Sequence, residues 1–209
     1  MRPYLTHYFT CGKESAQWLF GKRPAKEIIF LPNAINSRSF AFDAVTRDKV
    51  RREHGWTDKF VVGNISRFSH QKNHPFLIDI FADILRQNPS ALLVLVGSGG
   101  NTEDKEKKKV IGMGIGNNVI FLGNRSDISD LLQAMDVFLF PSRFEGLSVA
   151  QLEAQAAGLK IINSTSIPEE GTIIPELIES VSLKLSARQW ADIVIKKAHN
   201  YQRRNREQE

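Results

Sequence analysis

Two glutamates, Glu145 and Glu153, flank the start of a predicted helix, where they could bind the hydroxyl groups of a ligand. The apolar run 137–140 predicts a buried strand, and residues 147–157 predict the helix that follows it. A helix N-terminus favours phosphate, because it offers unpaired backbone N–H groups and the positive end of a dipole. The segment therefore predicts a site for a sugar joined through a diphosphate to a nucleoside.

A second segment, residues 63–74, places two permanent cations in the loop after another predicted strand. Arg67 and Lys72 could straddle a diphosphate, because a guanidinium binds phosphate in a forked geometry and an ammonium binds it as a point charge. The alternative is two exposed basic side chains, but beside the glutamate segment diphosphate binding is favoured. His70 and His74 have the spacing of metal ligands. Without a carboxylate or cysteine beside them, we expect ordinary loop and helix-cap histidines.

Glycine ends two further predicted strands, at Gly97 and at Gly123. The turn 97–100 lacks the third glycine of the dinucleotide-binding fingerprint, because Thr102 stands there, and no Gly-Lys-Ser/Thr follows as in a Walker loop. It predicts either a close approach of the backbone to a ligand or a simple turn. Asp127, shortly after Gly123, is predicted to cap the next helix.

The two glutamates could instead be the acid and base of a glycoside hydrolase. Helical rise would place them up to about 12 Å apart, whereas paired hydrolytic carboxylates lie roughly 5–9.5 Å apart. Two separate hydrogen-bonding roles along a long ligand therefore explain the pair better than a shared proton transfer.

Predicted strands and helices alternate along the chain, which is typical of an α/β fold with a Rossmann-like, doubly wound parallel sheet. The predicted strands are 28–31, 60–66, 91–96, 118–122, 137–140 and 160–163, and the predicted helices are 47–54, 75–87, 104–113, 127–135 and 147–157. Ligands of such sheets bind beyond the carboxyl ends of the strands. Arg67, Gly97, Gly123 and Glu145 all follow predicted strands, so we expect them at one edge of the sheet.

Three parts are predicted along the chain. Residues 1–24 hold an aromatic-rich helix, 14–20, that needs a surface to pack on; residues 25–185 form the main domain; residues 186–209 form an amphipathic helix and a polar tail. The tail segment 203–206 (Arg-Arg-Asn-Arg) could contact anionic lipid, but a solvated helix end is the favoured interpretation.

The composition of the 209 residues is that of a globular protein, with 42% hydrophobic and 24% charged residues. The net charge of +5 fits a ligand with phosphates, and equally a basic soluble domain. The single cysteine, Cys11, excludes an internal disulfide and a cysteine zinc site, which is typical of a reducing cytoplasm. We find no membrane-spanning apolar run and no signal-peptide pattern. The prediction is a cytoplasmic protein, with contact at the cytoplasmic face of the inner membrane left open.

In order along the chain, these motifs resemble the C-terminal, donor-binding half of a family 4 (group 1) glycosyltransferase with the GT-B fold, over about residues 25–200. The matching motifs are Leu31–Asn36, Arg67 and Lys72, the Val96-Gly97 turn, Phe121–Gly123, Asp136–Ser142 and Glu145–Gly158. The amino-acid sequence of the last segment is similar to that of enzymes that build bacterial capsular polysaccharide or exopolysaccharide. Ala34 replaces the glycine that usually follows Asn33 in this family, and this difference hardly weakens the resemblance.

The resemblance implies that a hexose is transferred with retention from a nucleotide diphosphate sugar, UDP-sugar being favoured, to a lipid-linked or saccharide acceptor. It implies no divalent metal, no cofactor and no nucleic acid. Arg67 and Lys72 would hold the departing diphosphate, Glu145 the hexose and Glu153 the ribose. The implied catalytic residues are Arg67, Lys72 and Glu145, and the implied donor-binding residues are Gly97, Arg125 (through its backbone, at the base), Gly146, Leu147, Ser148 and Val149 (N–H groups at the distal phosphate) and Glu153.

The GT-B fold has two Rossmann-like halves, and this sequence predicts one of them. We therefore expect a fragment whose N-terminal acceptor half belongs to the same protein, residues 1–24 being the last helix of that half. Such a fragment should bind nucleotide weakly and transfer nothing. The alternatives are a nucleotide-sugar epimerase of related fold and a non-catalytic interaction domain that keeps the fold. An NAD-dependent oxidoreductase is disfavoured for want of the glycine fingerprint.

Overall fold

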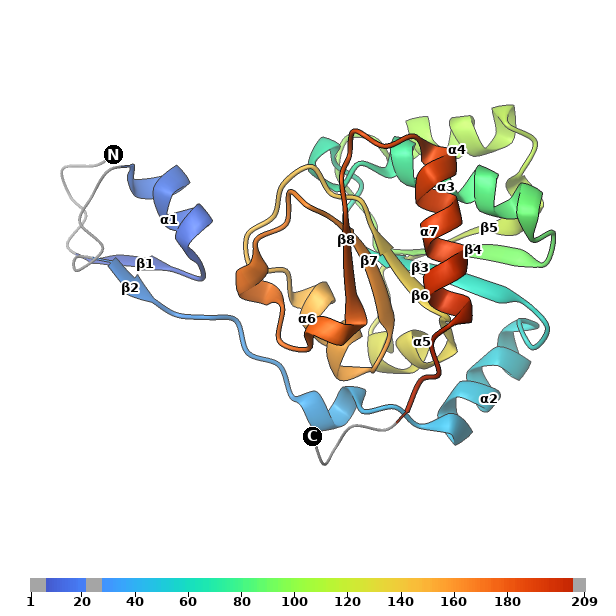
Figure 1. The fold of residues 1–209 in the computed structure, drawn as a ribbon, viewed down its shortest axis with the longest axis horizontal. Helices are drawn as coiled ribbons and strands as arrows, with labels where there is room; N and C mark the ends of the chain where they lie inside the picture. The colour runs from blue at the N-terminus through green and yellow to red at the C-terminus, as the bar shows by residue number, and fades with distance from the viewer. Residues whose placement is uncertain (1–6, 22–27, 205–209) are drawn as a thin grey trace.

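The protein, described over residues 7–21 and 28–204 in a computed structural model, folds around a six-stranded sheet (Figure 1). The strands are Phe60–Ile65 (β3), Ala91–Val96 (β4), Val119–Gly123 (β5), Val137–Phe140 (β6), Lys160–Ser164 (β7) and Ile178–Val181 (β8). Their order is β5-β4-β3-β6-β7-β8, and every neighbouring pair is parallel. The predicted parallel sheet is confirmed.

Helices cover both faces of this sheet. They are Ala44–His54 (α2), His74–Gln87 (α3), Glu103–Gly112 (α4), Ile128–Ala134 (α5), Val149–Ala156 (α6) and Ala187–His199 (α7), with short 3-10 turns at Ser37–Phe40 (η3), His70–Lys72 (η4), Gly116–Asn118 (η5), Glu169–Gly171 (η6) and Pro175–Leu177 (η7). Successive strand residues point to opposite faces. Val62 and Leu93 pack in the core beneath α3, α4 and α7, and Val61 and Leu92 pack in the core beneath α2, α5 and α6. The fold is doubly wound, as predicted.

The strand order reverses between β3 and β6. From there β4 and β5 follow on one side of the sheet, and β7 and β8 follow on the other. In such sheets the loops that leave the two strands at the reversal diverge, and ligands bind in the crevice between them. These loops are residues 66–73 and 141–148, and they carry Arg67, Lys72 and Glu145.

Three further elements form a small separate unit beside the main sheet (Figure 1): β1 (Tyr8–Thr10), α1 (Lys13–Phe20) and β2 (Ile28–Phe30). The prediction that residues 28–31 belong to the main sheet is wrong, because β2 pairs in parallel with β1. The sixth strand of the main sheet is β8, which the sequence analysis missed. As an edge strand with only Val181 buried, β8 has a weak apolar pattern.

Helix α7, predicted to lie in a C-terminal segment, is a layer of the main fold. Trp190 is fully buried, its ring meets Phe76 of α3 edge-on, and its Nε1–H donates to the Ser182 carbonyl at 3.0 Å. Ser186 and Gln189 form a capping box at the start of the helix. The predicted domain boundary near residue 25 stays a prediction.

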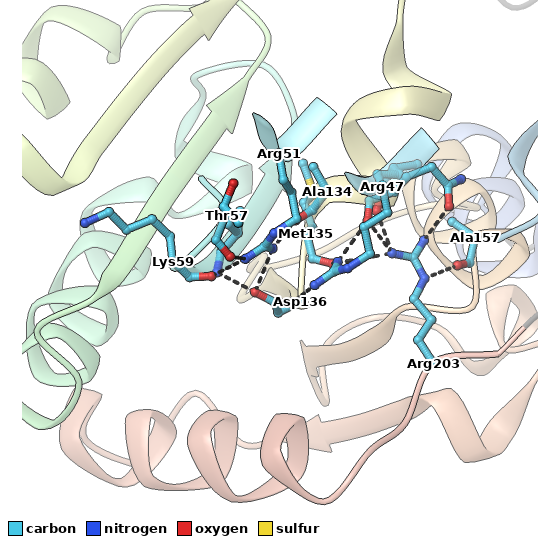
Figure 2. Close-up of polar contacts among 12 residues, drawn as sticks. Arg47, Arg51, Thr57, Lys59, Ala134, Met135, Asp136, Ala157 and Arg203 are labelled. Atoms are coloured by element: carbon cyan, nitrogen blue, oxygen red, sulfur yellow. Dashed lines mark hydrogen bonds and ion pairs between the residues drawn. The ribbon is translucent and has the colours of Figure 1, made fainter. Parts of the chain in front are cut away.

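Arg203 of the predicted tail is half-buried and contacts the ends of α5 and α6 (Figure 2). Its Nε–H donates to the Ala157 carbonyl at 2.6 Å, and Nη1 donates to the carbonyls of Leu132 at 3.0 Å and Gln133 at 2.9 Å. The solvated helix end predicted for this residue is wrong. The last carbonyls of a helix have no helical partner, and the guanidinium satisfies several of them at once.

For Asn205 and Arg206 of the predicted tail the expected solvated helix end is not tested, because both residues lie outside the described residues. Contact of the tail with anionic lipid stays a prediction. None of the helices in the described part of the chain has the length and apolarity that crossing a membrane would require.

Two further arginines gather around Asp136 at the same place (Figure 2). Arg51 lies 3.2 Å from Asp136 Oδ2 and donates to the Ala134 carbonyl at 2.7 Å, and Arg47 pairs with the other carboxylate oxygen. Asp136 also accepts from the Val61 N–H at 2.7 Å. Asp136 opens the motif 136–142, and these contacts tie α2 to the start of β3 and β6.

Candidate functional site

An ion pair between Lys72 and Glu145 joins the two loops at the strand reversal. Lys72 Nζ lies 2.7 Å from Glu145 Oε1 and 2.9 Å from Oε2, and the two side chains are only 16% and 5% exposed. Gln71 Nε2 donates to Glu145 Oε2 at 3.1 Å and to the Phe144 carbonyl at 3.0 Å. A carboxylate so enclosed requires such donors, because an unpaired buried charge is strongly destabilising.

Asn73 shapes the loop that carries Lys72. Its φ of 57° lies in the left-handed region, which asparagine tolerates better than most residues. Its side chain does not cap α3; Nδ2 donates to the Pro141 carbonyl at 3.0 Å. The Arg143 N–H donates to the Gln71 carbonyl at 2.8 Å. The loops after β3 and β6 are therefore held together by backbone and side chain.

His74 lies buried beneath this loop, at the first residue of α3. Its ring stacks on Phe68 with 4.4 Å between centroids, and Nε2 lies 3.2 Å from Ser66 Oγ, which in turn donates to Asn64 Oδ1 at 2.6 Å. Burial, with Lys72 as a cationic neighbour, lowers the pKa of His74 to about 4. His74 is thus a neutral structural residue of the loop, and His70 is exposed, so the two do not form a metal pair.

The buried neutral His74 should make the protein lose stability in mild acid. Its pKa is 6.5 unfolded and about 4 folded, so between these values the unfolded chain binds a proton that the folded protein does not. The free energy of unfolding should therefore fall by about 2 kcal/mol between about pH 7.5 and about pH 5. Urea unfolding of the wild type and of His74→Asn at both pH values measures this loss. An equal pH dependence in the two proteins would contradict it.

Helix α6 begins at Val149, two residues later than predicted. Ser148 is its N-cap, and Ser148 Oγ accepts from the Gln151 N–H at 3.4 Å. Asn33 Nδ2 donates to the Leu147 carbonyl at 2.7 Å, so the motif 31–36 is anchored to the turn before α6. The predicted phosphate-binding backbone of Ser148 and Val149 thus lies at the mouth of the helix.

Glu153 lies in α6, half-buried, and its carboxylate makes no hydrogen bond or ion pair within the described residues 7–21 and 28–204. Burial raises the pKa of Glu153. A half-buried carboxylate whose acceptor capacity is unused by the protein can accept hydrogen bonds from the hydroxyl groups of a ligand.

A hollow of about 570 Å³ lies between α1 and the loop after β6. Its lining comes from α1 and from the two loops of the strand reversal: Ser15, Trp18, Leu19, Gln71, Phe144, Glu145 and Gly146. A Cβ at Gly146 would lie 2.7 Å from Ser15 Oγ, so a larger residue there would require the Ser15 side chain to shift. The small N-terminal unit therefore contributes directly to the surroundings of Glu145.

A second hollow, of about 240 Å³, lies at the ends of β3, β4 and β5. Arg67, Gly97 and Arg125 line it, together with Ile65, Ser66, Val96, Ser98, Asn124 and Ile128. Gly97 has a φ of 123°, and a Cβ there would lie 2.3 Å from the Ser66 carbonyl oxygen, so the turn requires glycine. The close approach shown here is to the Ser66 backbone, so approach of this turn to a ligand stays a prediction.

The predicted site residues do not line one common hollow: Glu145 and Gly146 line the larger one, and Lys72, Glu153 and residues 147–149 line neither of the two. Lys72 contacts Glu145 at the larger one, whereas Arg67, Gly97 and Arg125 line the smaller one. Neither of these two hollows is lined by both Arg67 and Lys72. Their joint contact with one diphosphate stays a prediction.

The expectation for Asp127 needs correction. Asp127 precedes α5 but does not cap it, because its carboxylate binds Arg125 Nε at 2.8 Å and Nη2 at 2.6 Å. The sequence analysis also missed Gln71 and Trp18 as site residues. Gln71 could have been suspected because it is adjacent to Lys72 in the same turn. The sequence alone, however, does not show which side chains of the loop face Glu145.

The six-stranded sheet with its site at the β3–β6 reversal is the Rossmann-like fold of one half of a GT-B glycosyltransferase. Among solved structures, Anabaena Alr3699/HepE in complex with UDP and glucose matches 95% of this chain and 55% of its own, with a TM-score of 0.79 and 21% identity. The C-terminal domain of the glycosyl transferase group 1 protein LpcC from Francisella tularensis matches 80% of this chain and 89% of its own, with a TM-score of 0.67 and 20% identity.

Residues 46–206 match the family Glycosyl transferases group 1, and the chain belongs to this family. The putative glycosyltransferase EpsF of Bacillus subtilis (strain 168) is 32% identical over 194 residues, which are 90% of this chain and 50% of EpsF. The UDP-Gal:alpha-D-GlcNAc-diphosphoundecaprenol alpha-1,3-galactosyltransferase of Escherichia coli is 32% identical over 141 residues, 66% of this chain and 36% of that enzyme. The chain thus spans half the length of EpsF, and less of the second relative.

Proposed function

We propose that this chain is the donor-binding half of a glycosyltransferase and binds a nucleotide diphosphate sugar at the edge of the sheet where the loops after β3 and β6 meet. The observation that carries the proposal is the Lys72–Glu145 ion pair at the strand reversal. It places a cation suited to a diphosphate against a carboxylate suited to sugar hydroxyls. The diphosphate and the hexose are adjacent groups of the donor, so one ligand can contact both.

The remaining contacts follow the direction of the donor. The N–H groups of Ser148 and Val149 would bind the distal phosphate at the mouth of α6, and Glu153 would accept from the ribose hydroxyls. Gly97 and the backbone at Arg125 would contact the base, and Arg67 would contact the diphosphate from the smaller hollow. Positive groups that stabilise the departing diphosphate supply the catalysis.

For the donor we favour a UDP-hexose. Alr3699/HepE, which shares the fold, was solved with UDP and glucose, and the E. coli relative is named for UDP-Gal. The name of that relative also specifies a saccharide on a lipid diphosphate as acceptor. For this chain we propose that a hexose is transferred with retention to a surface polysaccharide. The transfer would take place at the cytoplasmic face of the membrane, without a metal or other cofactor.

The small unit formed by β1, α1 and β2 supports the proposal that the whole protein has a second half that packs against this unit. A two-stranded parallel sheet is unstable alone, because parallel sheets ordinarily have both faces covered. Here Phe9, Ile29 and Phe30 are 49%, 45% and 40% exposed. We propose that an acceptor-binding half covers them and that transfer needs it, so that this chain alone binds donor weakly and transfers nothing.

The ribose contact of Glu153 gives a test of the donor site. Glu153→Ala should weaken UDP binding about tenfold, because hydrogen bonds to a charged group are lost. It should weaken binding of 2′-deoxy-UDP less, since that ligand lacks one of the hydroxyls. Isothermal titration calorimetry with both nucleotides measures the difference.

Glu53→Ala, which removes an exposed carboxylate from α2, is the matched control. It should leave the affinities for UDP and for 2′-deoxy-UDP unchanged. If Glu153→Ala bound UDP as well as the wild type, or if neither protein bound UDP at millimolar concentration, a non-catalytic interaction domain would be the better account.

A further inference from the structure

We propose that the larger hollow contains a second saccharide subsite, in which a sugar ring of the acceptor lies between Trp18 of α1 and Phe144. The inference rests on the proposed function, because Glu145 at the inner end of the hollow is there assigned to the donor hexose. It extends that function by assigning Trp18 and Phe144, two residues outside the motifs, to recognition of the acceptor.

The two aromatic side chains that line this hollow are unusually exposed. Trp18 is 84% and Phe144 is 57% exposed, whereas the other two tryptophans, Trp56 and Trp190, are 2% and 0% exposed. Leu19, which also lines the hollow, is 43% exposed. Large apolar side chains gathered at one concave place indicate a binding site more often than scattered ones do.

The polar lining decides which class of ligand fits. The Glu145 carboxylate only accepts hydrogen bonds, and the Gln71 amide and the Ser15 hydroxyl can donate and accept. A pyranose ring has C–H faces that can stack on aromatic rings and a rim of hydroxyls that can reach these groups. An acyl chain offers no hydrogen-bond donor to the carboxylate, and a nucleobase offers fewer than a sugar.

The size of the hollow leaves room for a second ring. Its volume is about 570 Å³, within the roughly 300–1,000 Å³ that is typical of small-molecule sites. Glu145 is at the inner end, paired with Lys72, and Trp18 lies on the facing element α1. A sugar beside Trp18 would therefore be next to the sugar that Glu145 binds.

Specific contacts fix α1 at this position. Glu170 Oε2 accepts from the Lys13 N–H at 3.0 Å and so caps the helix in place of a side chain from Gly12. A Cβ at Gly12 would lie 2.6 Å from that oxygen, so a larger residue there would displace the Glu170 carboxylate from the helix start. Lys13 Nζ also lies 3.8 Å from Glu170 Oε1, and Ser15 lines the same hollow as Gly146. Trp18 therefore belongs to a helix that is anchored on the main fold.

Fluorescence of the purified chain can test the subsite, because Trp18 is the exposed one of its three tryptophans. Acrylamide quenching should report mainly on Trp18, and Trp18→Phe should remove most of it. The probes are the methyl pyranosides of glucose, galactose and N-acetylglucosamine, with the open-chain polyol sorbitol as the control. We expect at least one pyranoside to reduce quenching by half or more, and sorbitol to leave it unchanged.

Two variants make the test specific. Phe144→Ser should abolish protection by the pyranoside, whereas Val45→Ser, which removes an exposed apolar side chain from α2, should preserve it. Far-UV circular dichroism checks that both variants fold. Protection by none of the pyranosides, or equal protection in Phe144→Ser, would overturn the subsite, and so would a Trp18 that resists quenching before any sugar is added.

Calorimetry with UDP on the same sample separates the two proposals. UDP binding without pyranoside protection would overturn the acceptor subsite and leave the donor site standing. Pyranoside protection in a chain that does not bind UDP would support a saccharide site and overturn the proposed transferase role.

Discussion

Lys72→Met should lower the free energy of unfolding by about 3 kcal/mol, because it leaves the enclosed carboxylate of Glu145 without its cation. That carboxylate is 5% exposed and keeps only Gln71 as a side-chain donor within the described residues. The double variant Lys72→Met/Glu145→Gln should recover most of the loss, because the buried charge is then gone. Urea unfolding of the wild type, both single variants and the double variant measures the coupling between the two residues.

Lys49→Met is the matched control, since Lys49 and Glu53 are 65% and 58% exposed and lie 4.0 Å apart. It should cost less than about 0.5 kcal/mol. The stable double variant should still bind UDP-hexose at least about tenfold more weakly than the wild type, because charge-assisted contacts to the donor are lost. A coupling near zero would refute the pair, and full donor affinity in the double variant would refute its role in binding.

Arg203→Ala should cost about 3 kcal/mol of stability, because several buried carbonyls lose their donor together. The guanidinium binds the ends of both α5 and α6 and lies 4.5 Å from the centre of the Phe42 ring. Arg203→Lys should fall between the wild type and alanine, since an ammonium cannot reach these carbonyls in a planar fork. Urea unfolding followed by tryptophan fluorescence gives all three values.

Gln202→Ala, one residue earlier and exposed, controls for a general effect of changing the tail. Its stability should lie within about 0.5 kcal/mol of the wild type. A small effect of Arg203→Ala would mean that the tail frays in solution, as chain ends often do.

The parallel sheet could be predicted because β3, β4 and β6 are short, largely apolar runs buried on both faces. β8 could not, since an edge strand needs few buried residues. The residues 28–30 looked like a strand of the main sheet because β propensity does not specify a partner, and β1 is the partner they have.

The candidate site was predictable only in part, for a similar reason. The residue types of Lys72 and Glu145 suggested their chemistry, but their contact depends on β3 being next to β6, and alternation of strands and helices does not fix that order. Arg203 gave no signal at all. Its partners are backbone carbonyls at helix ends, which every sequence has and which become available to one side chain only in the folded protein.

The reversal of strand order also has a kinetic consequence. β3 can pair with β4 as soon as the intervening helix forms, but its other neighbour, β6, pairs Val137 with Val62, 75 residues further along the chain (137 − 62). Pairing over such separations slows folding, and during synthesis it must wait for the later residues to emerge from the ribosome. Lys72 and Glu145 meet at the boundary between the early and the late half of the sheet, so the nascent chain assembles its candidate site late.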